Sequence, residues 1–413
     1  MAVTRREVRL CNCRESITTG YSGAPVILRH AETPVFNFDT LKRVLESADR
    51  TVICRAACQS ALTERGGSSS VGEVWQAAQA AGTVICNAAG FEPGCFKERV
   101  LLETSPFRLI EALAIAGYAA DAREGIIFLP QQGGMPERIQ SVIAEAQKEG
   151  FLGRNIQNSG FNFNIRVFAG TGGYICREES ALRQLMQGSR AEPMPENGEP
   201  PIIHTIEALF QAAEIVENGA SPERDTRLFS VSGDVLYPGL YEAPYGSTLR
   251  ELIFRFAGGM ADGGRLKAAL VGGPGGICAG APDIDRRLES KDLPPGSGAI
   301  TVLSQSRCMV DTVQGIAAFF KDESCGLCTP CRVGTKRLHE VLSWWKSGAG
   351  DAADLKLVQG LGEVMQDTCG CSVGRSAANI FMTSLGHFYN EYQMHLAQKS
   401  CPANVCRPES KEI

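Results

Sequence analysis

Three cysteines at x2-x2 spacing, Cys325, Cys328 and Cys331, are the residues of this sequence whose pattern points most strongly to chemistry. A fourth cysteine, Cys371, follows forty positions after the third. Three clustered thiolates can reach three corners of one cluster, and thiolate sulfur is the soft ligand that iron–sulfur clusters require. Zinc usually takes two C-x2-C-type pairs. The spacing therefore predicts a [4Fe–4S] cluster, with zinc as the alternative.

A second group of soft ligands lies near the C-terminal end of the sequence. Cys308, His395, Cys401 and Cys406 offer three sulfurs and one imidazole, a set that suits tetrahedral zinc. Cys401 and Cys406 share one short loop, whereas Cys308 lies far upstream, so a zinc ion here would be structural and would tie distant segments together. Buried free thiols are the alternative interpretation.

A third group, Cys11, Cys13, Cys54 and Cys58, forms a C-x-C pair and a C-x3-C pair. We interpret it as ligands of a further iron–sulfur cluster, with zinc or unligated thiols as alternatives. The run at residues 51–54 between the pairs is rich in β-branched residues and indicates a strand. Residues 1–60 are thus expected to form a cysteine-containing N-terminal segment.

The elements that must position these residues fall into three further segments, residues 61–220, 226–300 and 308–413. In the first of them apolar runs alternate with helical patterns, such as a buried strand at residues 125–129 and a helix at residues 136–148. This alternation predicts an α/β domain.

The segment 226–300 has a different pattern. Strands at residues 228–231 and 239–241, joined through a turn at Ser232-Gly-Asp234, predict a hairpin. A short helix is expected at residues 247–253, with Ser247 as its cap. A hairpin followed by a helix in a small unit indicates a β-grasp module.

From residue 308 onward the sequence has a helical period. Helices are expected at residues 309–321, 335–346, 353–365 and 376–398. The cysteine triplet then falls in the loop between the first two helices, and Cys371 falls between the last two. The pattern predicts a helical bundle that holds one cluster in its loops.

Composition limits the class of protein. The 413 residues are 44% hydrophobic and 21% charged, and a net charge of −5 argues against nucleic acid as the main partner. The sequence has no run of 18 apolar residues and no apolar signal-peptide core, so we expect a cytoplasmic protein without direct membrane insertion. In that compartment thiols stay reduced, and the sixteen cysteines are better explained by metal ligation than by disulfides.

The motif SCGLCTPCRVG at residues 324–334, together with Cys86-Asn-Ala88, Glu92-Pro-Gly94 and Tyr174-Ile-Cys176, resembles a known family. This family comprises the NADH-binding flavoprotein subunit of respiratory complex I and the β subunits of multimeric iron hydrogenases and NAD-dependent formate dehydrogenases. The resemblance covers roughly residues 61–406. It implies an FMN/NADH-type α/β domain, a β-grasp (SLBB-like) domain and a C-terminal helical bundle with a [4Fe–4S] cluster.

The resemblance also implies roles for particular residues. Cys325, Cys328, Cys331 and Cys371 are the implied cluster ligands, with Cys369 as a rival for the fourth position. The hydrogenase β subunits resemble the proposed zinc pattern, and the N-terminal segment resembles a truncated thioredoxin-like or iron–sulfur module. In this family hydride passes from NADH to FMN, and electrons leave singly through the cluster.

The sequence departs from the family pattern at the flavin and nucleotide site. Two acidic residues of the family are replaced by Ala89 and Gly90, and a glycine is replaced by Arg177, whose long side chain is expected to occupy cofactor space. The glycine-rich phosphate loop and the paired asparagines are also altered. The residues that remain to hold part of an FMN are Arg65, Gly66, Gly67, Asn87, Glu92, Glu178 and Glu179.

These observations predict an iron–sulfur electron-transfer subunit of a multi-subunit redox complex that has lost NADH oxidation and has no catalytic residue of its own. FMN retention is not favoured. Its expected partners are other redox subunits, namely a catalytic dehydrogenase, reductase or hydrogenase and further iron–sulfur proteins. The first alternative is a working FMN-dependent NAD(P)H:acceptor oxidoreductase subunit with a remodelled nucleotide site. The second is a non-redox scaffold held by zinc alone.

Overall fold

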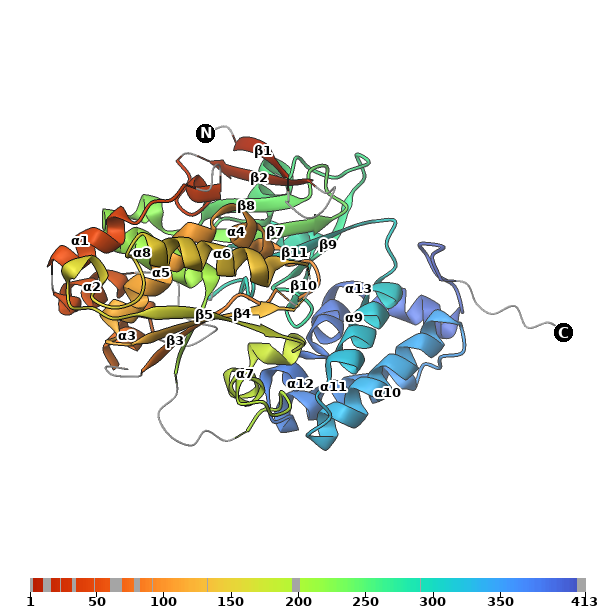
Figure 1. Ribbon diagram of the computed structural model, residues 1–413. Helices are drawn as coiled ribbons and strands as arrows, with labels where there is room; N and C mark the ends of the chain where they lie inside the picture. The colour runs from red at the N-terminus through yellow and green to blue at the C-terminus, as the bar shows by residue number, and fades with distance from the viewer. Residues whose placement is uncertain are drawn as a thin grey trace.

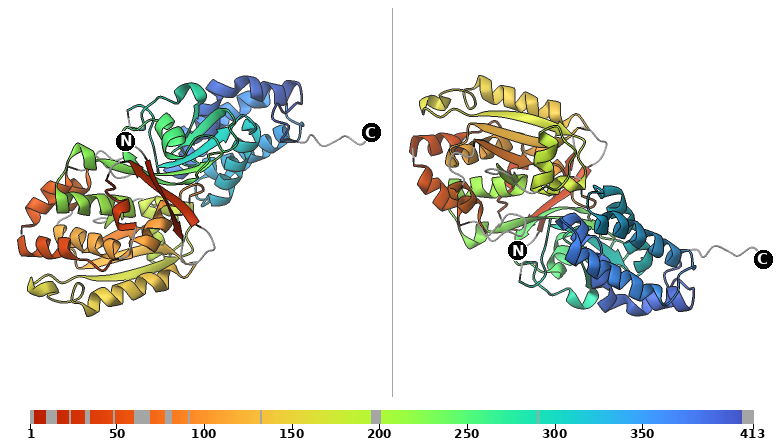
Figure 2. Two further views of the ribbon diagram at one scale, coloured as in Figure 1. Left: turned by 90° about the horizontal axis from the view of Figure 1, so that it is seen from above. Right: turned by 90° about the horizontal axis from the view of Figure 1, so that it is seen from below.

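The fold consists of a parallel α/β layer, a second mixed sheet and a C-terminal helical lobe (Figure 1). Viewed from above and below, the α/β layer and the helical lobe lie at opposite ends of the molecule, and the N-terminal strands lie where the two parts meet (Figure 2). The computed structural model describes residues 3–9, 16–22, 24–31, 35–47, 49–59, 69–77, 82–90, 92–131, 133–194, 201–289 and 291–406.

The α/β layer is built on a four-stranded parallel sheet in the order β5-β4-β3-β6. Its strands β3 and β4 are buried along almost their whole length, as expected for parallel strands covered on both faces. This confirms the predicted α/β class. The strands are β3 (Thr83–Asn87), β4 (Glu124–Pro130), β5 (Asn164–Gly170) and β6 (Ile202–Thr205).

Helices surround this sheet, and α5 is its central packing element because all but one of its fourteen residues are buried. The helix expected at residues 136–148 is present as α6. The helices are α1 (Asp39–Ser47), α2 (Arg50–Ala57), α3 (Val71–Ala77), α4 (Lys97–Thr104), α5 (Pro106–Ala119), α6 (Met135–Lys148), α7 (Glu179–Met186) and α8 (Ile206–Asn218).

The strand expected at residues 51–54 is wrong, because these residues lie in α2. Asp49 caps this helix, and its carboxylate accepts hydrogen bonds from the N–H groups of Thr51 and Val52. Ile53 and Ala57, one turn apart, then bury the same face of the helix. The β-branched composition favours a strand locally, but capping and burial against the helical layer outweigh that preference.

The second sheet has seven strands in the order β1-β2-β8-β7-β11-β9-β10. The predicted hairpin is present as the antiparallel pair β7–β8, and the N-terminal strand β2 pairs in parallel with β8. The first residues of the chain therefore complete the β-grasp sheet. The strands are β1 (Val3–Arg9), β2 (Ser16–Ser22), β7 (Thr226–Gly233), β8 (Gly239–Pro244), β9 (Leu266–Val271), β10 (Ile277–Gly280) and β11 (Ala299–Ser304).

The helix that follows the hairpin is a π-helical segment, η5 (Glu251–Phe256). The expected cap at Ser247 is wrong, since its hydroxyl donates to the carbonyl of Pro244 instead. Thr248 forms the cap: its hydroxyl accepts from the N–H of Glu251, whose carboxylate accepts from the N–H of Thr248. Short 3-10 turns occur at Leu28–Ala31, Ile156–Asn158, Tyr174–Arg177 (η3), Pro222–Arg224 and Ala281–Asp283.

The helical lobe contains a short extra helix, α12, where the sequence predicts a loop. Helix α10 begins six residues earlier than expected because Pro330 occupies its first turn, a position that proline favours. Cys331 therefore lies inside the helix and not in the preceding loop. The helices are α9 (Met309–Glu323), α10 (Thr329–Lys346), α11 (Asp354–Thr368), α12 (Ser372–Ser376) and α13 (Asn379–Ala397).

The core of this lobe is aromatic. The ring of Trp345 lies 6.0 Å from the rings of Phe381 and Tyr392, which are themselves 5.5 Å apart in an edge-to-face arrangement. Among the helices described by the structure, none is both long and apolar enough to cross a membrane.

Candidate functional site

The predicted cluster ligands come from two places in the helical lobe. Cys325 lies in the loop after α9, Cys328 immediately precedes α10, and Cys331 is buried in the first turn of that helix. Cys371 immediately precedes α12, and Cys369 ends α11. All five thiols lie in or against one apolar cluster, so the structure brings the distant cysteines to the triplet.

The environment of these thiols suits a buried metal cluster. Burial raises the pKa of the Cys371 thiol to about 11, and the charge of Glu178 acts in the same direction. Burial and the neighbouring thiols raise the pKa of Cys369 to about 12. Soft donors in an apolar setting are the donor set that a [4Fe–4S] cluster requires, so the residues fit this group. Cys369 and Cys371 lie in the same apolar group of residues, so their burial does not distinguish them. Cys371 stays the predicted fourth ligand.

Polar contacts hold the triplet loop in shape. Gly326 has a φ of +80°, a left-handed conformation that glycine adopts without strain. Its carbonyl accepts a hydrogen bond of 2.7 Å from Arg332, and the carbonyl of Cys325 accepts one of the same length from Arg190. Ser324 lies 3.2 Å from the sulfur of Cys331. The loop is therefore fixed from both sides.

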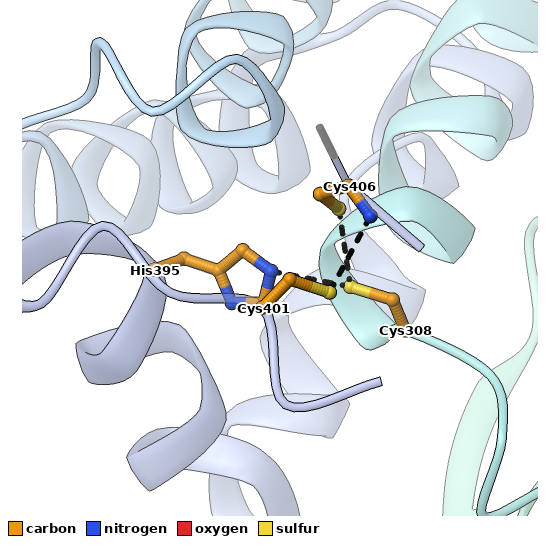
Figure 3. Close-up of side chains that lie close together, drawn as sticks. All are labelled: Cys308, His395, Cys401 and Cys406. Atoms are coloured by element: carbon orange, nitrogen blue, oxygen red, sulfur yellow. Dashed lines mark hydrogen bonds between the residues drawn. The ribbon is translucent and has the colours of Figure 1, made fainter. Parts of the chain in front are cut away.

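The predicted zinc ligands also converge (Figure 3). The ligand atoms of Cys308, His395, Cys401 and Cys406 all lie within 4.8 Å of one another. The sulfur of Cys308 is 3.3 Å from Nε2 of His395 and 3.5 Å from the sulfur of Cys406. Three thiols and an imidazole at this separation fit one tetrahedral metal ion.

The histidine of this group is oriented as a ligand. Nδ1 of His395 lies 2.8 Å from the carbonyl of Glu391, which accepts its proton and leaves Nε2 facing the sulfurs. Burial acts to lower the pKa of His395, but its hydrogen bonds to Cys308, Glu391 and Cys401, together with the charge of Cys308, outweigh burial and raise that pKa to about 9. A hydrogen bond to Cys406 and burial raise the pKa of Cys308 to about 12. Metal binding at this site must therefore release protons.

A further group of ligand-type side chains, His30, Glu214 and Glu217, is neutralised by protein cations. Arg29 pairs with both carboxylates, at 2.5 and 2.8 Å, and Arg108 approaches them as well. Burial, together with the charges of the two arginines, lowers the pKa of His30 to about 3. The group is therefore an ion-pair network.

The N-terminal cysteine set is only partly described. Cys54 is buried in the large apolar core, where its sulfur lies 3.7 Å from the carbonyl of Ala119, and Cys58 follows one turn later. Cys11 and Cys13 lie outside the described residues. The cluster expected from these four cysteines stays a prediction.

A cavity of about 840 Å³ lies between the α/β layer, the helical lobe and the second sheet, and residues of all three parts line it. Four of the seven residues predicted to hold part of an FMN line it, namely Asn87, Glu92, Glu178 and Glu179. Arg65, Gly66 and Gly67 lie outside the described residues.

Arg177 lies in the wall of this cavity and forms an ion pair with Glu92. Its guanidinium also stacks over the ring of Tyr174, with 4.9 Å to the ring centroid. The carboxylate of Glu92 accepts a second hydrogen bond of 2.6 Å from Ser297. Burial raises the pKa of Glu92, and the charge of Arg177 opposes that shift. The substituted arginine is therefore built into the cavity wall by its contacts with Glu92 and Tyr174.

Other residues in and near the cavity have structural partners. Asn87 donates a hydrogen bond of 2.9 Å to the carbonyl of Cys176. His204 is fully buried and accepts a hydrogen bond of 2.8 Å from the indole N–H of Trp75. Cys95 lines the cavity 3.5 Å from the carboxylate of Glu98, and burial raises its pKa.

Sequence reasoning missed the contacts that join the cavity wall to the cluster region. The carboxylate of Glu323 accepts a hydrogen bond of 2.7 Å from the N–H of Tyr174, and that of Glu178 accepts one of 2.8 Å from the N–H of Ser372. Glu323 and Ser372 each adjoin a predicted cluster motif in sequence. The only signal in the sequence was that Glu323 and Ser372 lie next to the cysteine motifs. It could not identify their partners, which lie more than a hundred residues away.

Comparison with known proteins gives three family matches in consecutive segments. The Nuo51 FMN-binding domain matches residues 58–221, the SLBB domain matches residues 228–276, and the NADH-ubiquinone oxidoreductase-F iron-sulfur binding region matches residues 311–395. These matches confirm the predicted fold class and the presence of an iron–sulfur binding region.

Individual relatives agree with this result. The chain is 36% identical over 346 residues to the HndC subunit of the NADP-reducing hydrogenase of Solidesulfovibrio fructosivorans, covering 78% of this chain and 70% of the relative. It is 33% identical over 417 residues to the F 2 protein of the NADH-quinone oxidoreductase of Rhizobium meliloti (strain 1021), covering 92% and 99%. A crystal structure of NAD⁺-reducing [NiFe]-hydrogenase in the H2-reduced state matches with a TM-score of 0.78 and 30% identity, over 91% of this chain and 67% of that one.

Proposed function

Because this chain belongs to the family of NADH-quinone oxidoreductase F proteins and related hydrogenase subunits, we propose that it carries electrons through a [4Fe–4S] cluster within a larger redox complex and does not oxidise NADH. Its membership supports a redox subunit. The loss of NADH oxidation is our own inference, from the residues of the cavity.

The observation that carries this inference is the ion pair between Arg177 and Glu92 inside the cavity. The side chain of Glu92 is only 7% exposed, so its charge depends on a close partner. A flavin or nicotinamide ring in this part of the cavity would have to displace Arg177 and leave the carboxylate uncompensated. Ala89 and Gly90, also in the cavity wall, lack the carboxylates that the family pattern has at these positions.

The cluster region needs no acid, base or nucleophile for this role. A [4Fe–4S] cluster held by Cys325, Cys328, Cys331 and Cys371 would supply one-electron transfer. Apolar side chains pack around the thiols, and Arg190 and Arg332 fix the loop. Because Leu327, between two of the ligands, is 47% exposed, the cluster loop lies at the surface where another carrier can approach.

Zinc at Cys308, His395, Cys401 and Cys406 has a structural role in this proposal. Cys308 precedes α9, His395 belongs to α13, and the other two ligands follow that helix. One ion would therefore tie the first and last helices of the lobe together. The four protein ligands leave no open position for a substrate.

For the domain organisation we retain the division expected from the sequence. We propose a flavin-type domain at residues 61–220, a β-grasp domain at 226–300, a cluster domain at 308–413 and an N-terminal segment at 1–60. The relatives are named as subunits of hydrogenases and quinone oxidoreductases, which supports other redox subunits as partners. The cytoplasm is the compartment that we propose.

A second candidate function is a working FMN-dependent NAD(P)H:acceptor oxidoreductase subunit. The size of the cavity, about 840 Å³, favours it, as does the retention of Glu179 in the cavity wall. In this case Arg177 would have to move aside, or would itself contact an anionic group of the ligand.

Cofactor content separates the two candidates. Anaerobically purified protein is analysed for iron, acid-labile sulfide, zinc and flavin. The proposal expects iron and sulfide in equal amounts, zinc, and no flavin, including after incubation with excess FMN and gel filtration. One FMN per chain would favour the second candidate. Zinc without iron would favour a non-redox scaffold and contradict both candidates.

A further inference from the structure

The carboxylate of Glu178 is held next to a predicted cluster ligand. It accepts hydrogen bonds from both the N–H group, at 2.8 Å, and the hydroxyl of Ser372, the residue that follows Cys371. Glu178 occupies the position before α7, but its side chain does not cap that helix. The side chain therefore serves the cluster region and not its own helix.

The segment that carries Glu178 is anchored on several sides. The N–H of Tyr174 donates to Glu323 at 2.7 Å, and the carbonyl of Cys176 accepts from Asn87 at 2.9 Å. The ring of Tyr174 packs against Phe319 at 5.1 Å between centroids. These contacts tie η3 to the end of α9 and to the end of β3. The charge of Glu178 thus has a fixed place relative to the cysteine ligands.

A fixed negative charge near an iron–sulfur cluster opposes the arrival of an electron, because the reduced cluster is the more negative form. Glu178 is half-buried, so the solvent screens this charge only in part. In addition, the hydrogen bond to Ser372 restrains the backbone that follows Cys371. Both effects act on the cluster without a bond to it.

We propose that Glu178 is a tuning residue that lowers the reduction potential of the cluster and holds the Cys371 turn in place. The inference rests on the cluster part of the proposed function and is independent of whether NADH is oxidised. It gives a glutamate of the cavity wall a role in electron transfer.

The test is a redox titration of the anaerobic full-length protein, followed by electron paramagnetic resonance of the reduced cluster. Glu178→Gln keeps the shape of the side chain and removes its charge. We expect the ratio of reduced to oxidised cluster at a fixed potential to rise by up to about tenfold, which is about 59 mV for a one-electron couple. Ser372→Ala removes one of the two donors but keeps the charge of Glu178, so its midpoint is expected to stay nearer to that of the wild type.

Two further variants serve as references. Glu178→Asp retains the charge and should stay closer to the wild type than Glu178→Gln does. Glu137→Gln makes the same chemical change at an exposed position in the first turn of α6 and should leave the midpoint unchanged. A midpoint in Glu178→Gln equal to that of the wild type would overturn the inference.

Failure of the inference is distinguishable from failure of the proposed function. A wild-type protein without any cluster signal would overturn the proposed function itself. If Glu178→Gln does not assemble a cluster, Glu178→Ala, which also removes the charge, is titrated in its place: a positive shift supports the tuning role, and an unchanged midpoint contradicts it.

Discussion

The cluster region and the cavity beside it share a wall but differ in how far they have departed from the family pattern. All four predicted cluster ligands are present, and they gather with Cys369 in one apolar cluster. In the cavity, by contrast, Arg177 fills space where the family pattern has a glycine, and it is held there by Glu92 and Tyr174.

This difference shows which properties of a site depend on individual residues. A cluster requires a bond at each corner, so the loss of one thiolate removes the site. The cavity is formed where the α/β layer, the second sheet and the helical lobe pack together. Its volume therefore depends less on the identity of individual polar residues in its wall. A retained cavity is therefore weaker evidence for a retained cofactor than a retained ligand set.

The largest effect is expected when a cluster ligand is removed. Cys328→Ser should remove the iron and sulfide of the [4Fe–4S] cluster, because serine does not replace a thiolate at a cluster corner. Iron and sulfide analysis and the visible spectrum measure the loss. Cys371→Ser should behave in the same way.

Cys369→Ser is the matched control, since this thiol is buried in the same apolar cluster. It should retain the cluster. A cluster that survives in Cys371→Ser and disappears in Cys369→Ser would instead identify Cys369 as the fourth ligand.

The next largest effect concerns the zinc site. Cys406→Ser should lose zinc and lower the free energy of unfolding by about 4 kcal/mol or more, because a structural metal contributes directly to folding. Zinc analysis and denaturant unfolding of the same preparation measure both quantities. Cys278→Ser, another buried thiol of the same core, should keep the zinc. Equal zinc content in Cys406→Ser and wild type would contradict the site.

A smaller effect is expected at the cavity. Arg177→Met leaves Glu92 buried without its cation and should lower the free energy of unfolding by about 3 kcal/mol at neutral pH. Burial raises the pKa of Glu92, so the folded protein binds a proton there at a higher pH than the unfolded chain does. The loss should therefore shrink as the pH falls.

The double variant Arg177→Met/Glu92→Gln should recover most of this stability, because no unpaired charge is left in the cavity. Urea unfolding of the wild type, both single variants and the double variant gives the coupling between the two residues. Additive effects would show that the pair does not hold the cavity wall, and would weaken the case against a bound flavin.

The sequence was sufficient for features that depend on spacing and period. The x2-x2 triplet and the α/β alternation rest on residue type at fixed intervals, and the alternation is present as a parallel sheet. The grouping of Cys308 with Cys406 rested on ligand type and on the family resemblance, and their ligand atoms lie together with those of His395 and Cys401. The prediction from strand propensity was wrong at residues 51–54, where capping by Asp49 and burial against the neighbouring helices favour a helix.

Contacts between distant segments were beyond the sequence. The pairing of β2 with β8 and the hydrogen bond of Glu178 to Ser372 depend on how three units pack, which no local pattern encodes. The Arg177 substitution suggested a filled cavity, but its partner Glu92 lies eighty-five residues away and became evident only in the folded chain.

The most direct test of the account is the visible spectrum of the anaerobic, cluster-loaded protein before and after addition of NADH, with dithionite as the positive control. The account predicts that dithionite bleaches the cluster absorbance and that NADH leaves it unchanged. Bleaching by NADH would contradict the account and would make this chain an NADH-oxidising subunit.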